Sequence, residues 1–178
     1  NGPDDGPTHR PGPVSAAELE PIDRRQVPWD VSMVSGYNAL VMYVFFSIVV
    51  TCPCPFRNFV FLSAGVIDTR RFKGVAEIEN LSANLREQLA NYVEFAKGRG
   101  YYAEARHEVG TDVIEIISHM AGVVAADFPN VVFFAGQLVF AEDKFITKLL
   151  HNQTAFLAQK KLVFAGYPMI VMPIRVLD

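Results

Sequence analysis

Residues 131–176 decide the fold that we expect for this chain, and they read VVFFAGQLVF at 131–140, EDKFITKLLHNQTAFLAQKKLVFAG at 142–166 and YPMIVMPIRV at 167–176. The first and last segments are apolar runs of strand length, and the middle segment carries polar residues at helical intervals. Continuous apolar runs are typical of strands buried on both faces of a parallel sheet. The stretch therefore predicts a strand, helix, strand unit, and the turn after Gly136 is the first place to look for a ligand.

The residues before this unit repeat the same alternation. Strand-like runs at 30–35, 58–67 and 101–109 are each followed by a segment with helical spacing, at 39–51, at 80–98 and after Thr111, the expected N-cap of the third helix. The run at 101–109, YYAEARHEV, has one polar face and is expected nearer a sheet edge. Alternation of this kind predicts an α/β fold with a five-stranded, mostly parallel, doubly wound sheet and helices on both faces.

Composition favours one folded domain that follows a tail. Of the 178 residues, 51% are apolar, which is enough for a sizeable core. Residues 1–27 are rich in Pro, Gly and charge, so they are expected to form a flexible linker or tail, with 28–178 as a single α/β domain. The chain opens without Met or an apolar signal segment, which suggests a piece of a longer protein.

Several classes of function are disfavoured by charge and length. The formal charge is -3 and the basic residues are spread thinly, so a nucleic acid polymer is not expected as a partner. The apolar run at 39–50 is shorter than the roughly 20 residues that a membrane helix needs. Cys52 and Cys54 flank Pro53 and lack both disulfide reach and the spacing of a zinc site, so they are expected to be reduced thiols.

Motifs that carry catalysis are missing from the sequence. It contains no Gly-x-Ser-x-Gly elbow, no phosphate loop ending in Gly-Lys-Ser/Thr and no His-Glu-x-x-His helix. The four histidines, His9, His107, His119 and His151, are scattered along the chain and give no sign of a shared metal. We therefore expect neither an enzyme nor a metal or other cofactor.

Ligands of doubly wound sheets bind beyond the carboxyl ends of the strands, so the loops after strands supply the candidate binding residues. Gly36 and Asn38 lie where a glycine turn meets a helix N-terminus, which can hold an anion but is equally explained as a tight turn. Gly65 precedes a polar loop with two arginines, which could meet a phosphate or simply be solvated.

The last candidate group follows Gly136. Lys144, His151, Asn152 and Thr154 include three polar residues within one helical turn. They could hydrogen-bond loop backbone where the helix bends or restarts, or they could form a binding surface for an anion or for the second subunit of a dimer.

Seven short segments, spread over residues 28–176, resemble the soluble C-terminal domain of bacterial permeases in the amino acid, polyamine and organocation (APC) superfamily. The most specific of them are LLHNQTA and the segment that begins GYPM. The segments are SGYN at 35–38, NFVF at 58–61, GVID at 65–68, FKG at 72–74, FFAG at 133–136, LLHNQTA at 149–155 and GYPM at 166–169.

This resemblance implies the universal stress protein fold and a non-enzymatic regulatory or dimerisation domain on the cytoplasmic side of the cell membrane. The implied partners are the transporter's own transmembrane domain and a second copy of the chain. Nucleotide-binding stress proteins have Gly, two residues, Gly, nine residues and then Gly-Ser or Gly-Thr after the fourth strand. Here Gly136 supplies the first glycine and Val139 replaces the second. A module that senses a nucleotide or cyclic dinucleotide is therefore the alternative function.

Overall fold

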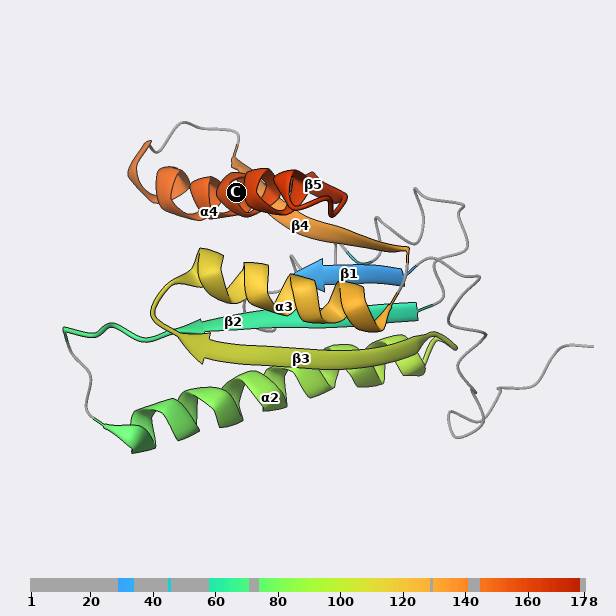
Figure 1. Cartoon of the computed structure of the whole chain (residues 1–178), viewed down its shortest axis with the longest axis horizontal. Helices are drawn as coiled ribbons and strands as arrows, with labels where there is room; N and C mark the ends of the chain where they lie inside the picture. Colours follow the sequence, from blue (N-terminus) through green and yellow to red (C-terminus); the bar gives the residue numbers. More distant parts are fainter. Residues whose placement is uncertain are drawn as a thin grey trace, which may run out of the picture.

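The computed structural model describes residues 29–33, 45, 58–70, 74–128, 130–140 and 145–176. From residue 58 onward, strands and helices alternate along this part of the chain, which confirms the predicted α/β class (Figure 1). The elements are β1 (Trp29–Met33), β2 (Asn58–Val66), α2 (Val75–Lys97), β3 (Tyr102–Gly110), α3 (Val113–Asp127), β4 (Val131–Phe140), α4 (Phe145–Phe164) and β5 (Met169–Val176).

The strands form a sheet in the order β3-β2-β1-β4-β5, and every neighbouring pair is parallel. β3 lies at one edge, as its half-polar pattern predicts, and β5 lies at the other. The chain moves outward from β1 to β3 and then crosses back to place β4 on the other side of β1. The order therefore reverses between β1 and β4, and this is where doubly wound sheets bind their ligands.

Side chains along β2 point alternately to the two faces of the sheet, and different helices cover the two faces. Phe59 and Phe61 face α2 in an aromatic cluster that also contains Tyr92 and Phe45, a helical residue before β2. The Phe61 and Tyr92 rings stack with their centroids 5.3 Å apart. Complete burial of an aromatic side chain contributes roughly 1.5–3 kcal/mol, so this cluster is a main source of stability.

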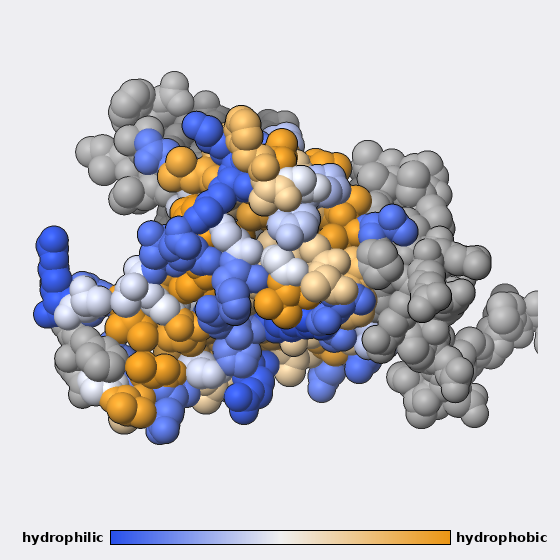
Figure 2. Space-filling view, viewed as in Figure 1, coloured by the Kyte–Doolittle hydropathy of each residue, from blue (hydrophilic) through white to orange (hydrophobic). Residues whose placement is uncertain are grey.

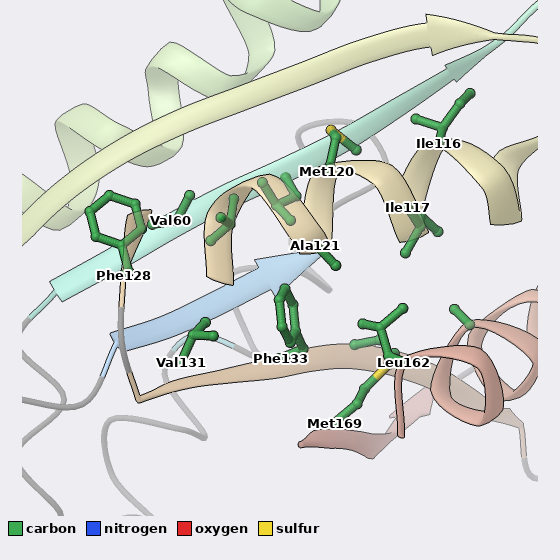
Figure 3. Close-up of a cluster of buried hydrophobic side chains, with 14 residues drawn as sticks. Val60, Ile116, Ile117, Met120, Ala121, Phe128, Val131, Phe133, Leu162 and Met169 are labelled. Carbon is green, nitrogen blue, oxygen red and sulfur yellow. The ribbon is translucent and has the colours of Figure 1, made fainter. Parts of the chain in front are cut away.

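The opposite face packs against α3 and α4 in a second, mainly aliphatic cluster (Figure 3). Val60 and Leu62 contribute from β2, while Phe133 contributes from β4. Their main partners on the helices are Ile116, Ile117, Met120, Ala121 and Val124 of α3 and Ala158 and Leu162 of α4. β2 is thus covered on both faces, as its continuous apolar sequence indicates.

Two predicted helix starts are wrong. α2 begins at Val75, five residues before the predicted start at residue 80. The N-cap of α3 is Asp112 and not Thr111, because the Asp112 carboxylate accepts hydrogen bonds from the backbone N–H groups of Ile114 and Glu115, at 2.8 and 3.1 Å. An N-cap side chain commonly accepts such hydrogen bonds, because the backbone N–H groups in the first turn have no partner within the helix.

Several predictions fall outside the described residues. They concern the tail at 1–27, the thiols of Cys52 and Cys54, and the helix at 39–51 apart from Phe45. Within the part of the chain that the structure describes, none of the helices has the length and apolar character needed to cross a bilayer.

Candidate functional site

The candidate site lies at the carboxyl ends of β1 and β4, where the strand order reverses. The last described pair between these strands is Ser32 with Phe134. β4 continues to Phe140 and pairs with β5 over this length, so among the described strands its edge toward β1 has no partner after Phe134. In doubly wound sheets, ligands bind beside the point where the strand order reverses, so the part of β4 after Phe134 is where a ligand is expected.

Gly136 lies on this part of β4. The sequence predicted a turn after Gly136, and this prediction is wrong, because the strand continues for four more residues. Its neighbour Ala135 is buried in the core, whereas Gly136 itself is exposed. The position beside the reversal point still fits a close approach between backbone and ligand, which a residue without Cβ permits.

Gly65 has a packing role that the sequence did not reveal. It lies inside β2, within the strand predicted at 58–67, and it faces α2. A Cβ at this position would lie 2.9 Å from Leu85 Cδ1, 3.0 Å from Val109 Cγ2 and 3.1 Å from Leu81 Cδ2. The close approach of α2 and β3 to the strand therefore explains the glycine without a ligand.

The polar residues His151, Asn152 and Thr154 lie within α4, which runs without interruption from Phe145 to Phe164. The interpretation that the helix restarts at these residues is therefore wrong. Thr154 is half-buried. Gly36, Asn38 and Lys144 lie outside the described residues. Besides Gly65, the structure places Gly136 on β4 after its last described pair with β1, and the polar residues 151, 152 and 154 on the helix that follows β4.

A polar network along β3 was missed by the sequence analysis. On the face toward α3, Arg106 forms ion pairs with Glu104 at 2.8 Å and with Asp127 at 2.6 Å. Partial burial opposes the charge of Arg106, but the hydrogen bond to Asp127 and the charge of Glu104 outweigh it and raise the pKa of the guanidinium. His119 also lies 2.7 Å from Glu108 on this face. The sequence pattern that could have revealed this network is the placement of charged residues at alternate positions, 104, 106 and 108.

On the face toward α2, Ser82 Oγ and His107 Nε2 form a hydrogen bond of 2.7 Å. Burial, and to a smaller extent the charge of Arg86, lowers the pKa of His107, so its imidazole is neutral at pH 7. A serine beside a neutral histidine is the start of a nucleophile and base pair. Among the described residues, however, no hydrogen bond is made to the other ring nitrogen, so the pair links α2 to β3 without the third group of a triad.

Comparison with known proteins identifies the fold. Neither the family models nor the curated proteins with which the sequence was compared match it. A universal stress protein family structure from Burkholderia pseudomallei is similar, with a TM-score of 0.55 and 13% identity over 86% of this chain and 100% of that chain.

Two other solved structures of this kind have similar scores. One is a universal stress protein from Archaeoglobus fulgidus (TM-score 0.51, 16% identity, 81% of this chain and 92% of that chain). The other is an Arabidopsis thaliana universal stress protein family protein with AMP bound (TM-score 0.51, 15% identity, 85% and 94%). At these identities the likeness establishes the fold alone, and the chain has a universal-stress-protein-like α/β fold.

Proposed function

We propose that this chain is a non-enzymatic regulatory and dimerisation module of universal stress protein type, and that it forms the cytoplasmic part of a transporter of the APC superfamily. The fold likeness supports the first part. The segments LLHNQTA at 149–155 and GYPM at 166–169, which resemble those of such permeases, support the second.

The observation that carries the proposal is the outer edge of β5. This strand pairs with β4 on one side, and among the described strands nothing pairs with its other side. Ile170 on this strand is about half exposed. An unpaired edge strand with an exposed β-branched residue is a template for another strand, and the same edge of a second copy provides a self-complementary partner.

Sedimentation velocity at tens of micromolar tests the dimer. We expect a species of roughly twice the chain mass of 19.8 kDa. Ile170→Asp should shift the protein to monomer, because it places a charge in the contact. Val75→Asp is the matched control, since Val75 is also exposed but lies at the start of α2. A wild-type monomer, or equal dissociation of both variants, would exclude the β5 dimer.

The transporter assignment is tested in cells of the source organism with an antibody raised against the purified chain. We expect the antibody to detect a protein much larger than 19.8 kDa in the membrane fraction, resistant to extraction with alkaline carbonate. A band of about the mass of this chain in the soluble fraction would contradict the assignment.

The alternative, a nucleotide-sensing module, is favoured by the position of Gly136 beside the point where the strand order reverses and by the AMP bound to a protein of similar fold. A ligand at 100 times its dissociation constant stabilises a protein by about 2.7 kcal/mol, which corresponds to a Tm increase of roughly 5–10 °C at this chain length. Thermal shift with AMP, ATP and cyclic dinucleotides should give this increase for wild type and a smaller one for Gly136→Val. No shift at millimolar nucleotide would exclude the alternative.

A further inference from the structure

Charge is segregated along this chain. Residues 145–176, which form α4 and β5, contain four basic residues and no Asp or Glu, although the whole chain has a formal charge of -3. The basic residues are Lys148, Lys160, Lys161 and Arg175. These two elements therefore contain more basic than acidic residues, which favours an anionic partner.

The outward face of α4 is apolar over its second half. Ala158 and Leu162 are buried against the sheet. On the opposite side of the helix, four large apolar residues are exposed: Phe156 (47%), Leu157 (54%), Val163 (52%) and Phe164 (84%). A helix that covers a core normally has a polar outer face, so an apolar one indicates a contact with something else. Figure 2 shows apolar surface mixed with hydrophilic surface over this region.

The exposed apolar residues surround lysines. Leu157, Lys160, Lys161 and Phe164 line a shallow open groove with Ile114 of α3. Lys161 is paired with Glu115 across this groove, which fixes its position. Lys160 is exposed and has no ionic partner among the described residues. Aromatic and aliphatic residues beside a lysine without an ionic partner, together on one helix face, fit the pattern of helices that lie in a bilayer interface.

We propose that the outer face of α4 docks on an anionic lipid surface, with Phe164, Leu157 and Phe156 inserted between headgroups and Lys160 extended toward lipid phosphates. A lysine can place its methylene chain along apolar groups while its ammonium remains among the polar headgroups. The apolar residues and the lysine can therefore both contact a suitable part of the lipid layer. The charge of the surface complements anionic lipid.

A second copy of the chain fits this face less well. A two-fold contact brings the same patch of both copies together, so Lys160 of each copy would lie in an interface that contains no acidic residue of α4. The proposal concerns a surface other than the β5 edge and does not depend on a link to a transporter.

Cosedimentation of the purified chain with vesicles tests the proposal. Wild type should bind vesicles of 70% phosphatidylcholine and 30% phosphatidylserine at low salt, and bind pure phosphatidylcholine much less. Lys160→Ala should weaken binding to the anionic vesicles about fivefold, as expected for one basic residue at the surface. Phe164→Ser should weaken it roughly tenfold, since an inserted aromatic ring is lost.

Lys97→Ala and Val75→Ser are the matched controls, because both residues are exposed on α2, which covers the other face of the sheet. They should bind like wild type, and circular dichroism should show that all four variants remain folded. Equal binding to both kinds of vesicle, or no binding by wild type, would overturn the proposal. Sedimentation of wild type as a dimer that Phe164→Ser dissociates would also overturn it and assign the face to a second copy.

Discussion

Gly65 offers the clearest test of whether a glycine in this chain serves packing or ligand binding. Gly65→Ala places a Cβ within 3.1 Å of Leu85, Val109 and Leu81, all closer than ordinary van der Waals contact. Overpacking of this kind costs about 1–3 kcal/mol. Ala also restricts the unfolded chain more than Gly does, and this effect stabilises the variant by about 0.4–1 kcal/mol. The expected result is a net loss of about 1–2 kcal/mol in the free energy of unfolding.

Gly122→Ala is the matched control, because it is the same substitution in the other helical layer. A Cβ there meets only Tyr167 Oη, at 3.9 Å, and Gly122 lies inside α3, where Ala is favoured over Gly by about 1 kcal/mol. Urea denaturation should therefore show Gly65→Ala less stable than wild type and Gly122→Ala more stable, with unchanged m-values. If Gly65→Ala were as stable as wild type, the packing explanation of Gly65 would be refuted.

Three further predictions concern the core, a helix cap and pH. Phe133→Ala should cost about 3–5 kcal/mol in urea denaturation, because Phe133 is completely buried between the sheet and α3, and a loss below 1 kcal/mol would contradict this placement. Asp112→Ala should cost about 1 kcal/mol and Asp112→Asn less, since Asn retains the cap oxygen; equal stability of Asp112→Ala and wild type would argue against the cap. Lowering the pH from 7.5 to 5.5 should reduce the free energy of unfolding of wild type more than that of His107→Gln. Folding lowers the pKa of His107, so the unfolded chain binds more protons than the folded one as the pH falls. Equal reductions for the two proteins in denaturant melts at the two pH values would contradict this.

The elements were largely predictable because their signals are local. The apolar runs at 58–67 and 131–140 predicted β2 and β4 to within a residue, since strands buried on both faces are marked by continuous hydrophobicity. The start of α2 was missed because its N-cap, Gly74, makes no side-chain hydrogen bond to the first turn, so the usual cap signal is missing from the sequence. Thr111 and Asp112 are both good caps by composition, and only the backbone geometry selects Asp112.

The candidate site was less predictable, because its residues are brought together by strand order. The sequence marked Gly136 through its place in an apolar run, but its position beside the point where the strand order reverses is a property of the sheet. Gly65 is also a glycine in an apolar run, but in the structure it is a packing residue. The distance between β2 and α2 decides this, and the sequence around Gly65 does not reveal that distance. The pair of Ser82 and His107 joins residues 25 positions apart and left no local pattern.

The sequence by itself determined which segments are strands and helices and that the central strands are buried, because periodicity and hydrophobicity act within a few residues. It also determined the excess of basic over acidic residues at 145–176. Only the tertiary structure decided that the order reverses between β1 and β4, that β5 is an edge, and that Phe164 faces outward. These features depend on contacts between residues that are far apart in the chain, and such contacts are selected by the packing of the whole sheet.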